Sequence, residues 1–138
     1  MNEPKPASLA QRMQIRPMST IMILHAPEGY ALGEMPKGCV VVRAGPADVV
    51  QVFFGGVADV TERVPEALAA LKPGGILWCC YPKKTGAIRT DITRDYGWET
   101  LTAAGFEGVR QISIDESWSA VRFRPVGEIK RRGGAQRV

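Results

Sequence analysis

Histidine and cysteine are scarce in this chain of 138 residues, which has one histidine and three cysteines. Cys79 and Cys80 are neighbours in an apolar run, so in a strand their side chains point to opposite faces and do not ligate one metal together. With His25 as the sole imidazole, the sequence lacks the clustered ligands of a zinc site. We expect no metal centre, and no complete catalytic motif is present.

Long hydrophobic runs are also missing. No apolar stretch approaches the roughly 20 residues that span a bilayer, and the start of the chain, MNEPKPASLAQ, has no apolar signal segment. Apolar residues make up 45% of the chain and charged residues 23%, as in ordinary globular domains. We therefore expect a cytoplasmic protein that does not associate with membranes.

The formal net charge of +4 is unevenly distributed along the chain. Residues 1–19 contribute +2 and residues 126–138 contribute +3, so the segment between them carries −1. This distribution predicts little affinity of the folded body for nucleic acid. A solvated tail that aids solubility is the simpler interpretation of residues 126–138, and contact with a nucleic-acid backbone is the alternative.

Composition divides the chain into three parts. Residues 1–19 are rich in Pro, Ser and polar groups and predict a flexible N-terminal arm, whereas residues 126–138 predict a flexible basic tail. The 20–125 segment has the length of a single domain with its own core.

The stretch Leu71–Lys84, LKPGGILWCCYPKK, organises the predicted domain. Pro73 and the two glycines after it predict the end of a helix and a turn. The apolar run 76–81 is too short for an isolated helix and is bounded by Gly-Gly and Pro82. It therefore predicts a strand buried on both faces of a parallel sheet.

The other elements follow from similar patterns. Strands are predicted at 20–26, 39–43, 49–54, 108–114 and 118–124, the last two forming an antiparallel hairpin. Apolar residues at helical spacing predict a helix over 57–72, with a kink or a late start at Pro65. A second helix is predicted to begin at Asp91, Thr93 or Asp95 and to end near Ala104. Residues 31–37 fit either a loop or a short helical turn.

These elements predict a small Rossmann-like α/β fold, a mostly parallel sheet with an antiparallel edge hairpin. Residues 48–124, with their LKPGG turn before a central strand and their closing hairpin, resemble the carboxyl half of S-adenosylmethionine-dependent methyltransferases. In that family a glycine-rich cofactor loop follows the first strand, and an acidic residue ends the second. Here the corresponding positions hold Ala26-Pro27-Glu28-Gly29 and Arg43. The resemblance therefore implies a methyltransferase-like scaffold, and we expect no cofactor.

Short motifs spread over the second half of the chain resemble a bacterial family known as a domain of unknown function. The likeness spans about residues 20–125 and implies a fold but no activity. Its motifs are Tyr81-Pro82-Lys83, Asp91, Arg94-Asp95, Gly97-Trp98, Ser113-Ile114-Asp115-Glu116, Trp118-Ser119 and Arg122-Phe123-Arg124-Pro125.

The loops that follow parallel strands meet at one rim of a sheet, where ligands bind in open α/β folds. Two lysines beside a helix N-terminus could hold a phosphate or carboxylate there. The simpler interpretation of the charged residues at this rim is a network of surface ion pairs. For the carboxylates at the hairpin tip, the simpler interpretation is that they form the turn. The candidate ligand-binding residues are Lys83, Lys84, Thr85, Asp91, Arg94, Asp115, Glu116 and Trp118.

Other reactive side chains predict little chemistry. His25 follows an apolar strand and is either a general base or, more simply, a residue that caps the strand end. Cys79 and Cys80 lie in the central strand, where buried thiols are mostly inert. Trp118, Arg122 and Arg124 alternate on one face of the last strand, where they form either a stacking platform or a packed outer surface.

Three functions remain open from the sequence. The first is a module that binds a small anionic ligand or a protein partner on a scaffold without its cofactor loop. The second is a small enzyme that acts on an anionic metabolite, with Lys83 holding the anion and Asp91 or Asp115 as acid or base. The third is a nucleic-acid associate that uses its basic tails. A homodimer is also left open.

Overall fold

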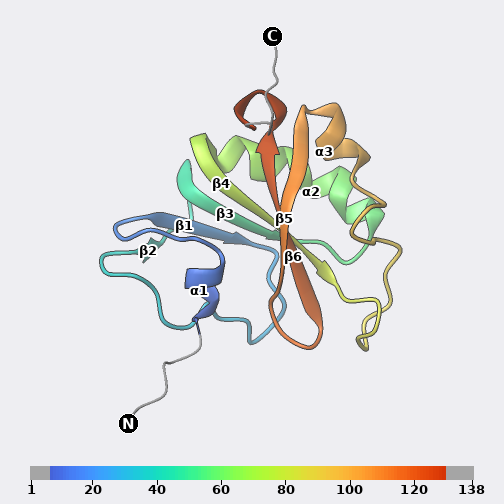
Figure 1. Ribbon diagram of the computed structural model, residues 1–138, viewed down its shortest axis with the longest axis horizontal. Coiled ribbons are helices and arrows are strands. Elements are labelled where there is room, and N and C mark those ends of the chain that lie inside the picture. The colour runs from blue at the N-terminus through green and yellow to red at the C-terminus, as the bar shows by residue number, and fades with distance from the viewer. Residues whose placement is uncertain (1–6, 130–138) are drawn as a thin grey trace.

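A six-stranded sheet forms the centre of the computed structural model, which describes residues 7–129 (Figure 1). The strand order is β2-β1-β3-β4-β6-β5. The first four of these are parallel to one another, and β6 is antiparallel to both β4 and β5. The predicted sheet with its antiparallel edge hairpin is confirmed. The strands are β1 (Thr20–Leu24), β2 (Val40–Val41), β3 (Ala47–Phe53), β4 (Leu71–Pro82), β5 (Phe106–Ser113) and β6 (Trp118–Pro125).

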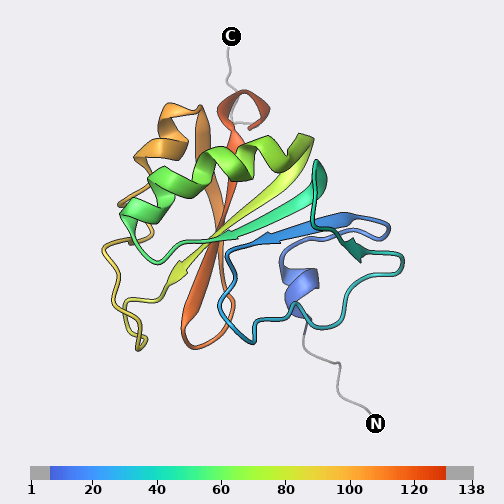
Figure 2. The ribbon, with the colours of Figure 1, turned by 180° about the vertical axis from the view of Figure 1, so that it is seen from behind.

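The two faces of the sheet are covered differently. Helices α2 (Val57–Ala70) and α3 (Glu99–Ala103) lie on one face, and α1 (Leu9–Arg12) lies on the other together with the 25–39 segment (Figures 1 and 2). The predicted apolar stripe of α2 faces the sheet, with Val60 and Val64 buried. The helix begins at Val57 and continues through Pro65. It therefore does not have the late start that the proline suggested.

The second half of strand β4 is buried, as its apolar run predicted. All residues from Leu77 to Pro82 are buried. Leu77, Cys79 and Tyr81 belong to the core under α2 and α3, whereas Trp78 and Cys80 belong to the core under α1. The strand therefore places Tyr81 and Pro82 at a rim where several loops can meet.

The start of β4 differs from the prediction. Leu71 was expected to end a helix, but its backbone is extended at φ −91° and ψ 126°, directly after Ala70 of α2. Ala47 of β3 pairs with Leu71, and Val49 pairs with Ile76. Residues 72–75 thus bulge from the strand and do not form a separate turn, so the proline and glycines interrupt the ladder without ending the strand.

The N-terminal arm is packed against the sheet over residues 8–15, so the prediction of a loose arm is wrong there. Ser8 and Gln11 form a capping box at the start of α1. Ala10 and Met13 have no exposed surface, and the indole nitrogen of Trp78 donates to the carbonyl oxygen of Met13 at 2.9 Å. Buried apolar contacts outweigh the polar composition of this segment. Residues 1–6 lie outside the described part of the chain.

The C-terminal tail was expected to begin at residue 126, but its first residues are ordered. Val126–Glu128 form a 3₁₀ turn, and the amide of Val126 donates to the carbonyl oxygen of Gly105 at 2.8 Å. The basic run 130–138 lies outside the described residues.

The second predicted helix begins later than expected. It starts at Glu99, so Asp91, Thr93 and Asp95 do not cap it, and residues 83–98 form a long loop. Gly97 has φ +104°, and a Cβ there would lie 2.9 Å from a methyl group of Val57. This left-handed residue separates the loop from α3.

Candidate anion-binding site

The loop after β4 meets the tip of the β5–β6 hairpin, as the strand directions predicted. The amide of Lys83 donates to the carbonyl oxygen of Ser117 at 2.8 Å, and Pro82 pairs with Trp118. In Figure 1 the 83–98 loop and the hairpin tip lie at the same end of the sheet. This rim therefore gathers side chains from β4, β5, β6 and the loop.

A cavity of about 450 Å³ lies at this rim, and we call it the Lys83 cavity. It brings together four of the residues predicted from the sequence: Lys83, Lys84, Thr85 and Arg94. No carboxylate is found among the described residues that line it. Three cationic side chains and several hydroxyl groups thus face a common space. Its other lining residues are Tyr81, Ile92, Thr93, Gln111 and Ser119.

The walls of the Lys83 cavity are held by hydrogen bonds. The Nζ atom of Lys83 donates to Oγ of Ser113 at 2.6 Å, which ties the loop to β5. The Tyr81 hydroxyl interacts with Ser119 and Gln111 on the neighbouring strands. Burial raises the pKa of Tyr81, with Arg94 acting in the opposite direction. Tyr81 therefore stays a neutral hydroxyl at neutral pH and can donate to an anion.

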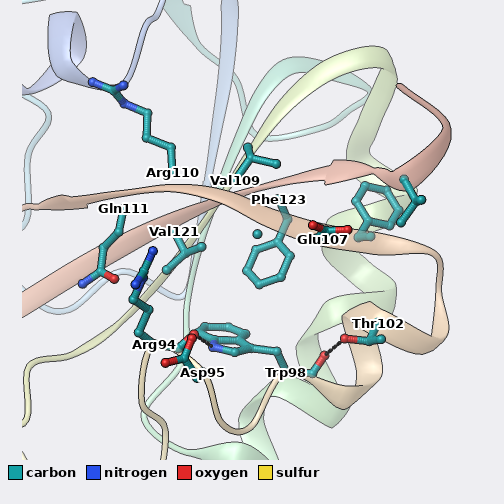
Figure 3. A pocket seen from close by; sticks show the side chains of 13 residues that line it. Arg94, Asp95, Trp98, Thr102, Glu107, Val109, Arg110, Gln111, Val121 and Phe123 are labelled. Atoms are coloured by element: carbon teal, nitrogen blue, oxygen red, sulfur yellow. Dashed lines mark hydrogen bonds between the residues drawn. The ribbon is translucent and has the colours of Figure 1, made fainter. Parts of the chain in front are cut away.

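A second cavity, the Trp98 cavity, adjoins the first and has a volume of about 340 Å³ (Figure 3). Arg94 and Gln111 line both cavities. Figure 3 shows Trp98 and Phe123 forming its aromatic part, with Arg94 and Gln111 side by side at one end. The carboxylates Asp95 and Glu107 also line the Trp98 cavity. The cationic lining without a carboxylate therefore belongs to the Lys83 cavity, and the aromatic lining to the Trp98 cavity.

Gly108 of β5 lines the Trp98 cavity, and its lack of a side chain leaves space there. A Cβ atom at this position would lie 3.0 Å from Cγ1 of Val121 and 3.6 Å from Cε2 of Phe123. Any larger residue would thus press on the floor of the cavity and occupy part of its space.

Trp98 positions the loop that carries Arg94. Its ring centroid lies 5.5 Å from that of Tyr81 and 5.1 Å from that of Phe123. Its indole nitrogen donates to the carbonyl oxygens of Thr93, at 2.9 Å, and Arg94, at 3.1 Å. A buried aromatic side chain thus fixes the backbone from which Arg94 reaches the Lys83 cavity.

The predicted carboxylates line neither cavity. Oδ1 of Asp91 accepts from the amide of Val57 at 2.8 Å, at the start of α2. Oδ1 of Asp115 accepts from the amides of Ser117 and Trp118, at 2.8 and 2.9 Å, in the hairpin turn. Glu116 is exposed at the same tip. Asp91 and Asp115 are therefore engaged with main-chain donors.

Trp118 lies on the opposite face of the sheet from the Lys83 cavity. Its ring packs edge-on against Phe53, with centroids 5.2 Å apart, in the core under α1. It does not contribute to the lining of either cavity.

The remaining candidates lie away from this rim or inside the core. His25 Nε2 lies 2.8 Å from Oε1 of Glu66 in an exposed pair with α2. Cys79 and Cys80 are fully buried, and burial raises the pKa of both thiols, that of Cys80 to about 12. Neither thiol is an accessible nucleophile.

Tyr81, Gln111 and Ser119 line the Lys83 cavity but were not among the residues predicted from the sequence. The hairpin register contained the signal. Tyr81 pairs with Ser119, and Gln111 pairs with Val121. Since side chains alternate along strands, the predicted hairpin would place these polar groups on the face of Tyr81.

The rim after β1 and β3 differs from a methyltransferase cofactor site. Residues 25–39, between β1 and β2, form turns and no helix. Tyr30 folds back on the sheet: its ring lies 4.9 Å from that of Phe53, and its hydroxyl is 2.9 Å from Oε1 of Gln51. Arg43 follows the second strand. These residues do not fit the glycine-rich loop, helix and acidic residue that hold the cofactor in that family.

No helix within residues 7–129 is long and apolar enough to cross a membrane. Within the same residues no group of three or more His, Cys, Asp or Glu side chains is arranged to hold a metal ion.

Three solved structures have similar folds at low sequence identity. DhpI in complex with SAM and HEP has a TM-score of 0.53 and 12% identity, covering 86% of this chain and 84% of its own. The ribosomal protein L11 methylase from Lactobacillus delbrueckii subsp. bulgaricus has a TM-score of 0.50 and 10% identity, with coverages of 84% and 74%. The B. subtilis tRNA methyltransferase TrmK has a TM-score of 0.50 and 11% identity, with coverages of 88% and 67%.

No protein-family model matches the chain, and no curated protein has a similar sequence. The resemblance to a domain of unknown function stays a prediction. At these identities the structural likeness concerns the fold. The chain therefore has a methyltransferase-like, Rossmann-type α/β fold.

Proposed function

We propose that this protein binds a small ligand with an anionic head group and an aromatic or apolar body. The observation that carries the proposal is the lining of the Lys83 cavity by Lys83, Lys84 and Arg94, with no carboxylate among its described lining residues. Clustered cations with adjacent hydroxyl donors attract phosphate and carboxylate groups. The scaffold is that of a methyltransferase that has lost its cofactor loop.

The Trp98 cavity supports the second half of the proposal. It shares Arg94 and Gln111 with the cationic cavity and continues over Trp98 and Phe123. An anion held by Arg94 could thus extend an aromatic or apolar group across these rings, where it would bury apolar surface.

Binding is better supported than catalysis. A general acid or base must lie within hydrogen-bond reach of the reacting group. Asp91 and Asp115 were the expected candidates, and their oxygens accept from main-chain amides outside the cavity. An enzyme that uses Lys83 with one of these carboxylates is therefore the weaker alternative.

Thermal denaturation with phenyl phosphate and with inorganic phosphate tests the proposal. A ligand present at about ten times its Kd should raise the Tm by about 4 °C. We expect phenyl phosphate to stabilise the wild type more than inorganic phosphate does at equal concentration. Lys83→Gln and Arg94→Gln should remove most of the effect, whereas Lys37→Gln, an exposed lysine outside both cavities, should keep it.

Gly108→Ala separates the two halves of the proposed ligand. The added methyl group narrows the Trp98 cavity, so the variant should lose the advantage of phenyl phosphate and keep the response to inorganic phosphate. An unchanged response in Lys83→Gln and Arg94→Gln would place binding elsewhere and contradict the proposal.

A further inference from the structure

A second basic cavity lies at the rim opposite the Lys83 cavity. We call it the Arg122 cavity; its volume is about 540 Å³. Residues 14–19 of the N-terminal segment, the β4 bulge and β6 line it. Its charged lining residues are Arg16, Asp48, Lys72, Arg122 and Arg124.

Asp48 is the single carboxylate in this set, and its negative charge does not offset the positive charges of the arginines. Oδ2 of Asp48 accepts from the amide and the hydroxyl of Thr20, at 2.8 and 3.0 Å. Its Oδ1 lies 3.2 Å from Nζ of Lys72. These hydrogen bonds, with the neighbouring Lys72, lower the pKa of Asp48. Asp48 therefore neutralises Lys72.

Arg124 is also partly engaged. It pairs with Glu107 across the β5–β6 ladder, and its Nη2 donates to the carbonyl oxygen of Glu128 at 3.2 Å. The unbalanced charge at this rim thus belongs to Arg16 and Arg122, which take part in no ion pair among residues 7–129.

Arg122 is held in an unfavourable environment. Arg110 lies directly opposite it on β5, and like charges in such pairs destabilise a sheet. Figure 3 shows the side chain of Arg110 leaving β5 on the side away from Arg94 and Gln111. Burial, together with Arg124, Arg110 and Arg16, lowers the pKa of Arg122. Within residues 7–129 no carboxylate forms an ion pair with Arg122.

One nitrogen of Arg122 has no hydrogen-bond partner. Nη1 donates to Oε1 of Gln14 at 2.6 Å, but Nε is buried without an acceptor. A buried unsatisfied donor on a charged group is costly. Nε itself has almost no exposed surface, so a phosphate in the cavity would be held by the other N–H groups of the guanidinium, a group that matches phosphate geometry.

We propose that the Arg122 cavity binds a compact phosphate-bearing anion of low molecular weight, held by Arg122 and Arg16. The N-terminal segment borders the cavity on one side and the bulge 72–75 on another, and its volume of about 540 Å³ has room for a group the size of pyrophosphate. This site is independent of the Lys83 cavity, because the two share no lining residue.

Thermal denaturation with pyrophosphate at low, constant ionic strength tests the proposal, with chloride as the salt control. Pyrophosphate should raise the Tm of the wild type by several degrees, and Arg122→Gln and Arg16→Gln should each remove most of the shift. Arg89→Gln removes the same charge from an exposed loop residue, and Lys83→Gln alters the other cavity. Both should keep the shift.

The anion-free proteins provide a second measurement. Arg122→Gln removes the repulsion with Arg110 and the unsatisfied donor, which offsets the loss of the hydrogen bond to Gln14, so its Tm without pyrophosphate should stay close to that of the wild type. A Tm lower by many degrees would show that Arg122 is kept for a structural role and would overturn the proposal. If Arg89→Gln lost as much of the Tm shift as Arg122→Gln, the proposal would also be overturned, because the shift would then reflect general charge attraction only.

Discussion

The indole nitrogen of Trp98 lies 3.1 Å from the main-chain carbonyl oxygen of Arg94. The same nitrogen also bonds the carbonyl oxygen of Thr93, so one buried side chain fixes the backbone that presents Arg94 to the Lys83 cavity. Trp98→Phe should keep much of the ring packing and lose both hydrogen bonds, at a cost of about 1–2 kcal/mol in the free energy of unfolding. Urea denaturation measures this cost.

The variant should also weaken phenyl phosphate binding, since the Arg94 loop is no longer fixed. Trp118→Phe is the matched control on the opposite face of the sheet, and it should leave binding unchanged. Equal binding by Trp98→Phe and the wild type would show that the indole does not position Arg94.

Asp91 is expected to stabilise the protein without taking part in ligand binding. Its Oδ1 accepts from the first amide of α2, as an N-cap side chain does, although it comes from a distant loop. Asp91→Ala should lower the free energy of unfolding by about 1 kcal/mol and leave phenyl phosphate affinity unchanged. Asp91→Asn keeps an acceptor oxygen and should cost less. A large loss of affinity in Asp91→Asn would instead favour an acid–base role.

The buried thiols predict a loss of stability at alkaline pH. The pKa of Cys80 is raised to about 12 by burial, whereas an unfolded thiol titrates near 8.5. Above pH about 8.5 the unfolded state releases a proton that the folded state keeps, so the free energy of unfolding falls as pH rises towards the folded pKa.

Each such thiol contributes a slope of up to about 1.4 kcal/mol per pH unit. Between pH 9.5 and 11, the free energy of unfolding of Cys80→Ala should therefore fall less steeply than that of the wild type, by up to about 1.4 kcal/mol per pH unit. Urea denaturation at each pH measures this slope. Parallel curves for Cys80→Ala and the wild type would contradict the burial of this thiol.

Met13 tests the packing of the N-terminal segment. Its side chain is fully buried under α1, so Met13→Ala should cost about 2–5 kcal/mol through the cavity it leaves. Met18 is 73% exposed, and Met18→Ala should change stability by less than about 0.5 kcal/mol. Similar small effects in both variants would support the loose arm that composition suggested.

The sheet could be predicted because its signals are local. The run 76–81, the apolar spacing of α2 and the short turn 115–117 each specify one element within a few residues. The packing of α1 could not be predicted in this way, since it depends on contacts between Met13 and Trp78, 65 positions apart along the chain.

The site was predicted in part for a similar reason. Lys83, Lys84 and Thr85 follow a recognisable strand, and the strand direction fixes the rim on which they lie. The roles of Asp91 and Asp115 could not be predicted from residue type, because any carboxylate near a free amide can act as an acceptor or as a catalytic group. The structure distinguishes the two by supplying the amides of Val57 and Ser117.

Ligand binding at the Lys83 and Trp98 cavities can be observed residue by residue in a phenyl phosphate titration followed by amide NMR. We expect saturable shifts of the amides of Lys83–Thr85, Thr93–Asp95 and Gln111, which line the two joined cavities or adjoin their lining residues. These shifts should disappear in Arg94→Gln and persist in Lys37→Gln. Saturable shifts confined to residues 25–30 and 55–56, at the rim where methyltransferases hold their cofactor, would contradict binding at these two cavities.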